Sequence, residues 1–120
     1  MDKAATSEFS KAVVALKKAL ATELSDIQRD ASIQRFEFCI TLAWKTAKKV
    51  MGTYQTSPKQ VIREMAQAQL IEDIELWLQA IDKRNLSSHT YKEALAIEVY
   101  QFAKVFLPHL EKLMITLSSQ

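Results

Sequence analysis

Glycine is nearly absent from this sequence, which has one glycine, two prolines and one cysteine in 120 residues. An average protein has about 7% glycine and about 5% proline, so turn-forming residues are too few here for a sheet of many strands. A glycine-rich phosphate loop and a dinucleotide-binding fingerprint are excluded, because each needs several glycines. The composition favours an all-α fold, and the length fits a single helical domain over residues 1–120.

Disulfide pairs and long apolar runs are also missing. The lone Cys39 excludes an internal disulfide and fits a reducing cytoplasm, which is the expected location. The longest apolar run is Ala12–Leu16, so the sequence predicts neither a transmembrane helix nor a secretory signal peptide. The net charge of +2 is unevenly spread: residues 1–63 carry 11 basic and 6 acidic side chains, whereas residues 64–120 carry 5 and 8. The first half is the one expected to attract phosphates or an acidic partner.

Apolar residues recur at spacings of three and four, which predicts amphipathic helices. We expect five helices, over residues 7–24, 30–51, 58–69, 74–84 and 91–120. Gly52 provides a stop for the second and Pro58 a start for the third. Thr90 and Glu93 match the Ser/Thr-x-x-Glu capping box, and Pro108 should bend the last helix. The predicted architecture is an antiparallel four-helix-type bundle with one short extra helix.

Metal-ligating groups are scarce, since the chain has two histidines, one cysteine and no ligand-spaced cluster. We therefore expect no metal site and no cofactor. His109 fits a structural or solvated role, and Cys39 fits a small core hydrophobe.

The aromatic and basic residues of the second helix have two interpretations each. Trp44 lies on an apolar stripe, which favours a core position over a base-stacking platform. The patch formed by Lys45, Lys48 and Lys49 fits a solvated helix face better than a phosphate track.

Residues 83–91 place Arg, Asn, Ser, His and Tyr at one helix junction. Arg84 can bind a phosphate in bidentate fashion, and His89 can exchange a proton near neutral pH. The start of the next helix, at Tyr91, has free N–H groups that favour an anion. A phosphate site with an acid–base group is one interpretation. An ordinary turn with an exposed His89 is the other, and spacing alone favours it.

A family resemblance changes that balance. Arg84-x4-His89-x-Tyr91 resembles the Arg-x4–6-His motif of the HEPN superfamily, in its Arg-x4-His-x-Tyr form. The chain is similar to one branch of it, the nucleotidyltransferase substrate-binding protein family. The similar stretches span nearly the whole chain in matching order: 30–49 (DASIQRFEFCITLAWKTAKK), 57–64 (SPKQVIRE) and 84–91 (RNLSSHTY).

The resemblance implies a HEPN-like bundle that forms a homodimer and binds a minimal nucleotidyltransferase encoded nearby. Related HEPN proteins are toxins of toxin–antitoxin pairs, namely metal-independent endoribonucleases built across a dimer interface. In one group the partner adenylylates the motif tyrosine and silences the toxin. Carried over by position, Arg84 and His89 are the catalytic residues, Asn85 is a supporting polar group and Tyr91 is the modified hydroxyl.

Three functions remain open at this point. The favoured one is a ribonuclease toxin that acts on RNA and is silenced by adenylylation of Tyr91. The alternative is a non-catalytic substrate-binding subunit of a two-component nucleotidyltransferase, which would hold a nucleotide or another substrate. The third is a helical interaction protein without chemistry of its own. For the first function we expect a symmetric homodimer with both Arg84–His89 segments near the two-fold axis.

Overall fold

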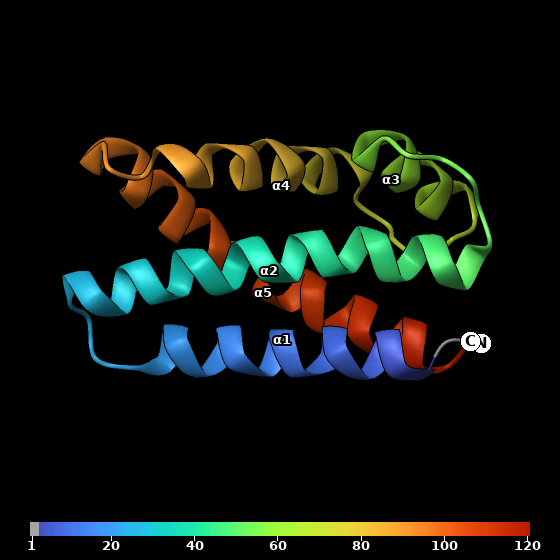
Figure 1. Ribbon diagram of the computed structural model, residues 1–120, viewed down its shortest axis with the longest axis horizontal. Coiled ribbons are helices and arrows are strands. Elements are labelled where there is room, and N and C mark those ends of the chain that lie inside the picture. The colour runs from blue at the N-terminus through green and yellow to red at the C-terminus, as the bar shows by residue number, and fades with distance from the viewer. Residues whose placement is uncertain (1–2) are drawn as a thin grey trace.

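The computed structural model describes residues 3–120, and these residues form five α-helices (Figure 1). The helices are α1 (Lys3–Ala21), α2 (Asp26–Met51), α3 (Pro58–Gln67), α4 (Ile74–Leu86) and α5 (Glu93–Ser118), and the 3₁₀ turn η1 (Ser87–His89) follows α4. Helices hold 82% of the described residues, none of which lies in a strand. The predicted all-α fold is confirmed.

The four long helices run alternately in opposite directions, and the short α3 packs on α2 and α4 (Figure 1). This is the predicted four-helix-type bundle with one short extra helix. The bundle measures 39 × 23 × 20 Å. The α1–α2 turn and η1 lie at one end of it, and α3 lies at the other (Figure 1). In the described part of the chain, no helix combines the length and hydrophobicity that a membrane span requires.

Local signals in the sequence explain most of the helix ends. Gly52 ends α2 in the left-handed conformation, with φ of +70°, as predicted. Helix α2 begins four residues earlier than expected, because the Ser25 hydroxyl accepts a hydrogen bond of 3.0 Å from the N–H of Gln28. Helix α5 continues through Pro108, and the bend predicted there stays a prediction.

The core is formed by the predicted apolar stripes of α1, α2 and α5. Members with no more than 1% of their surface exposed include Phe9, Val13, Leu16, Phe36, Ile40, Val99, Phe106, Leu110 and Leu113. Trp77 of α4 meets Phe106 edge to face, with ring centroids 4.7 Å apart. Leu24 is the last residue of the helix predicted over 7–24, but it is 73% exposed, because α1 ends at Ala21.

Two neighbouring residues of α2 lie on different faces of the helix, one toward the core and one toward solvent. Cys39 is fully buried, as predicted, and burial raises the pKa of its thiol to about 12. Its neighbour Phe38 is 44% exposed. An exposed aromatic ring beside a sealed core leaves an apolar outer surface on this helix.

Candidate functional site

The Arg–His–Tyr motif spans the junction between α4 and α5. Arg84 and Asn85 lie in the last turn of α4, His89 ends η1, and Tyr91 follows in a turn. Arg84 is half-buried, whereas Asn85, His89 and Tyr91 are exposed. The motif therefore has one anchored cation and three exposed groups.

Arg84 is held by a polar group of α2. Its Nε–H donates a hydrogen bond of 3.1 Å to the Thr41 hydroxyl, and its Nη1 lies 3.5 Å from the Asn85 side-chain oxygen. The remaining guanidinium N–H groups keep their donor capacity for an anion. The contact between Asn85 and Arg84 is at the edge of hydrogen-bond range, and the supporting role of Asn85 stays a prediction.

A second link ties η1 to α2. The Ser87 hydroxyl lies 2.8 Å from a carboxylate oxygen of Glu37 and is only 9% exposed. Glu37 and Thr41 are one helical turn apart, so they face the motif from the same side of α2. Sequence reasoning did not name these two residues. The signal that could have found them is the polar line that they form beside the apolar stripe.

His89 and Tyr91 lie close to each other. Their ring centroids are 6.1 Å apart at an interplanar angle of 71°, an edge-to-face arrangement. Tyr91 is 78% exposed. The backbone beneath the two rings is fixed, because the N–H of Lys92 donates to the carbonyl of His89 over 3.1 Å. The two side chains are accessible to a macromolecule on a backbone turn that is itself hydrogen-bonded.

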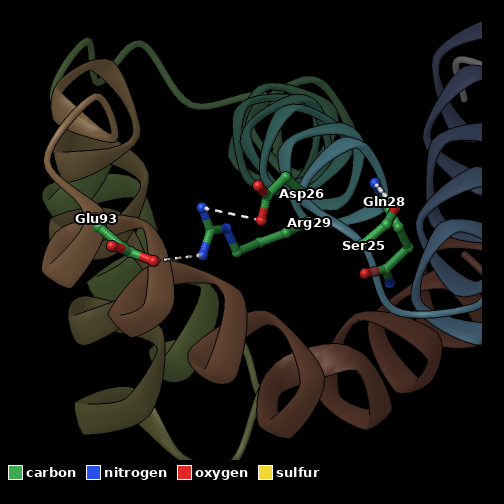
Figure 2. A network of polar contacts seen from close by, with 5 residues as sticks. All are labelled: Ser25, Asp26, Gln28, Arg29 and Glu93. Atoms are coloured by element: carbon green, nitrogen blue, oxygen red, sulfur yellow. Dashed lines mark hydrogen bonds and ion pairs between the residues drawn. The ribbon is translucent and has the colours of Figure 1, made fainter.

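The predicted capping box at Thr90 and Glu93 is wrong. The Thr90 hydroxyl donates to the carbonyl of Ser87 over 3.1 Å, which leaves it in the preceding 3₁₀ turn. Glu93 instead lies 3.8 Å from the guanidinium of Arg29 on α2 (Figure 2). Helix α5 consequently begins at Glu93, and Tyr91 is outside it.

This correction changes the electrostatics expected at Tyr91. The positive end of α5 already carries the Glu93 carboxylate in its first turn. A phosphate near Tyr91 would gain less from that helix end than the sequence suggested. The cation available within the motif is Arg84.

Arg84 also lines a hollow of about 700 Å³ on the outer surface of α1 and α2. Its walls combine apolar, basic and acidic side chains. Phe38 and Leu42 lie beside Arg35, Lys11 and the acidic Glu37. Neither His89 nor Tyr91 is among the described residues that line this hollow. Arg84 therefore faces the α1–α2 surface, and the exposed ring pair lies outside that hollow.

The other candidate residues have structural surroundings. His109 stacks on Phe106, with ring centroids 5.4 Å apart and planes 15° from parallel. Cys39 is sealed in the core. Within residues 3–120, the structure has no group of three or more His, Cys, Asp or Glu side chains arranged to hold a metal ion.

Comparisons with known proteins identify the family. The model of the family described as "Nucleotidyltransferase substrate binding protein like" matches residues 4–119. The chain belongs to this family. The family match covers every helix of the bundle and includes the Arg84–Tyr91 segment.

One curated relative of this family member is described as "Probable ribonuclease HepT", from Haemophilus influenzae. The two are 34% identical in an alignment 86 residues long, which covers 63% of this chain and 58% of the relative. The match thus spans less than two thirds of the relative's length.

Two solved structures share the fold. A crystal structure of a Thermus thermophilus protein has a TM-score of 0.76 and 34% identity, covering 92% of this chain and 96% of the other. A Haemophilus influenzae structure has a TM-score of 0.71 and 28% identity, covering 96% of this chain and 95% of the other. The second was described as revealing the fold of a substrate binding domain of a nucleotidyltransferase.

Proposed function

We propose that this protein is a metal-independent endoribonuclease, the toxin of a toxin–antitoxin pair, and that its partner is a minimal nucleotidyltransferase. One observation carries the proposal. An exposed His89 lies five positions after Arg84, and the guanidinium of Arg84 is hydrogen-bonded to Thr41. Such an arrangement suits phosphoryl transfer, which needs a proton carrier and a fixed cation. The relative named as a probable ribonuclease supports the same activity.

The chemistry assigned to the motif needs two proton transfers. The His89 imidazole of one protomer takes the proton of a ribose 2′-hydroxyl, and the 2′-oxygen attacks the adjacent phosphorus. The bond from phosphorus to the 5′-oxygen breaks, and that oxygen takes a proton from an imidazolium. Arg84 stabilises the negative charge of the pentavalent phosphate. The products are a 2′,3′-cyclic phosphate and a free 5′-hydroxyl.

A homodimer would supply the second histidine for this scheme. The apolar part of the α1–α2 surface supports a dimer, since Val14 and Phe38 are 45% and 44% exposed there. Arg84 lines the same surface beside Phe38. Pairing two copies through it would bring both Arg84–His89 segments toward the two-fold axis.

Tyr91 is the proposed site of control. Its hydroxyl would attack the α-phosphorus of a nucleoside triphosphate held by the nucleotidyltransferase, forming an oxygen–phosphorus bond and releasing pyrophosphate. The exposure of Tyr91 and the 6.1 Å between its ring and that of His89 support this role. The attached nucleotide would add charge and bulk beside His89 and block RNA without unfolding the protein.

The deciding experiment measures RNA cleavage by the purified protein. We expect wild-type protein to cleave single-stranded RNA in the presence of a chelator, and Arg84→Ala and His89→Ala to be inactive. His109→Gln is the matched histidine control and should retain activity, because His109 stacks on the core ring of Phe106. Cleavage that survives both motif substitutions would remove the motif from the mechanism.

The alternative function is a non-catalytic substrate-binding subunit of the nucleotidyltransferase. The description of the Haemophilus influenzae structure favours it. Co-expression with the neighbouring nucleotidyltransferase, followed by intact-mass and peptide mass spectrometry, separates the two. An adenylyl-sized increase on Tyr91 supports the toxin, whereas co-purification with unchanged mass and no cleavage supports the binding subunit.

A further inference from the structure

A second hollow lies along the C-terminal half of α2, away from the motif. It has a volume of about 570 Å³ and is bordered by the start of α1, the last turns of α2 and the loop after Gly52. Cavities of about 300–1,000 Å³ are the size that binds small molecules or parts of polymers. Its chemically distinctive lining residues are Trp44, Lys45, Lys48, Lys49 and Tyr54.

Two aromatic side chains line this hollow, one exposed and one half-buried. Tyr54 is 96% exposed, in the loop between α2 and α3. Trp44 was expected in the core; it does pack against the core, but at its edge, where it is only half-buried and lines the hollow. The other tryptophan, Trp77, is 2% exposed and inside the bundle. Exposed aromatic faces carry a cost in water that stacking on a nucleobase relieves.

Positive charge surrounds these rings. Among the described residues lining the hollow, three are lysines and one, Glu8, is acidic. The Lys45 ammonium lies 5.8 Å from the centre of the Trp44 ring, so a cation and an aromatic face are presented together. A polyanion with aromatic groups complements this surface, because its phosphates can meet Lys45 and Lys48 while its rings meet the aromatic side chains.

The hollow lies next to the one that Arg84 lines along α2. Leu42 contributes to both. Thr41, which holds Arg84, precedes Lys48 by seven residues of α2, or about 10 Å of helix. That length matches a few nucleotides at about 3.4 Å for each stacked base. One strand could therefore contact Arg84 and the basic aromatic hollow together.

We propose that this hollow binds single-stranded RNA next to the scissile phosphate, with bases stacked on Trp44 and Tyr54 and phosphates held by Lys45 and Lys48. The inference rests on the proposed ribonuclease function, because that function identifies the polyanion as RNA. The uneven charge of the chain then has a role, because the basic residues 1–63 supply the lysines that bind the RNA phosphates.

Trp44 provides a direct test, because the second tryptophan is buried. A His89→Ala protein, which should not cleave, is titrated with short oligouridylate while tryptophan fluorescence is followed. We expect saturable quenching that disappears in a Trp44→Phe background. Tyr54→Ala should weaken binding about 5- to 150-fold, the loss of one stacked base. Lys45→Gln should weaken binding. It should also reduce the slope of log binding constant against log salt concentration by the amount expected for about one phosphate contact.

Lys104→Gln is the matched control. Lys104 lies 5.6 Å from the Tyr100 ring centre on α5, so it repeats the lysine–aromatic pair of Lys45 and Trp44 outside the hollow. This variant should bind RNA as the parent protein does. Because Tyr54 is almost fully exposed, Tyr54→Ala should keep the helical circular dichroism spectrum and the thermal midpoint of the parent.

The outcomes separate this inference from the proposed function. Quenching that depends on Lys45 and Tyr54 supports the RNA site, even if the wild-type protein cleaves nothing. Cleavage by the wild type with no quenching, or with equal affinity in the Tyr54→Ala and Lys45→Gln variants, overturns the RNA site while leaving the nuclease intact. A Trp44 signal that responds to the co-purified nucleotidyltransferase and not to RNA also overturns it, in favour of an acidic protein surface.

Discussion

The two ends of the Arg–His–Tyr motif differ more in structure than their spacing suggests. Arg84 is half-buried and hydrogen-bonded to Thr41 of α2, whereas His89 and Tyr91 are exposed on a 3₁₀ turn and the turn after it. Four residues lie between a cation whose side chain is held by a tertiary contact and a ring pair whose side chains are exposed. The first end depends on the packing of the bundle, and the second is exposed to solvent.

This contrast assigns different requirements to the two ends. A cation that stabilises a transition state works best when it is positioned before the substrate arrives. In the proposed function, the imidazole of His89 and the hydroxyl of Tyr91 must instead be accessible to two different partners, the RNA and the nucleotidyltransferase. Substitutions at Arg84 should therefore change both stability and activity, and substitutions at His89 or Tyr91 should change activity alone.

Loss of cleavage is the largest effect we expect. His89→Ala should reduce the rate about 100- to 10,000-fold, the range for a removed acid–base group. Arg84→Ala should be similarly impaired, because the phosphate charge loses its cation. Initial rates on a fluorescent RNA measure both. Arg84→Lys keeps the charge but not the planar guanidinium. A wild-type rate in that variant would contradict bidentate binding of the phosphate by Arg84.

Reactivity of Cys39 tests the packing beneath the anchored end. Its raised pKa of about 12, against an ordinary value of 9.0, predicts about 1,000-fold less thiolate near neutral pH than an exposed cysteine has. Labelling by a thiol reagent should be slow in the wild type and in His89→Ala. Labelling of His89→Ala at the rate of the unfolded chain would show that the exposed end does support the core.

The same pKa gives a pH dependence with a defined sign. Because folding raises the pKa of Cys39 from 9.0 to about 12, the protonated thiol favours the folded state. That contribution is fully present below about pH 9 and is lost as the pH rises from about 9 toward 12. Urea denaturation at several pH values should register the loss in the wild type, and a Cys39→Ala variant should lack this component.

The free energy of unfolding should also differ between Arg84 and His89 variants, by less than their effects on the rate of cleavage. Arg84→Ala removes the hydrogen bond to Thr41, and Thr41→Val leaves the Nε–H without that acceptor, so each should cost about 1 kcal/mol. His89→Ala should stay within about 0.5 kcal/mol of the wild type, as exposed sites do. Equal midpoints for all three variants in urea would erase the distinction between the two ends.

Tyr91→Phe should have the smallest effect on the fold. The hydroxyl belongs to a side chain that is 78% exposed, so its loss should change the free energy of unfolding by less than about 0.5 kcal/mol. The same variant should lose the adenylyl mass increase entirely when co-expressed with the nucleotidyltransferase. A modified Tyr91→Phe protein would move the acceptor to another residue.

Two capping-box patterns explain where sequence reasoning about the helices succeeded and failed. Ser25 and Gln28 fit the same Ser/Thr-x-x-Glu/Gln pattern as Thr90 and Glu93, and Ser25 does cap α2. Thr90 does not cap α5, because its hydroxyl bonds to the preceding turn and Glu93 faces Arg29. Which hydroxyl caps a helix thus depends on acceptors and charges that other helices bring close.

The site was predictable to the extent that it is local. The motif residues were named from sequence, and their place at a helix junction was correct. Glu37 and Thr41 were missed because they lie more than 40 residues from the groups they hold. The accessibility of Trp44 was also missed, since its position on an apolar stripe does not reveal that the stripe reaches the edge of the core there.

The sequence by itself determined the helical class, the direction of the bundle's apolar faces and the burial of Cys39. Glycine scarcity and the spacing of apolar residues act within a few residues of chain, so they can be recognised without a fold. Only the tertiary structure decided that Arg84 is held by Thr41, that the side chains of His89 and Tyr91 are exposed, and that Leu42 lines two hollows. Those features arise where helices distant in the chain come into contact, and such contacts follow from the whole packing arrangement rather than from any local pattern.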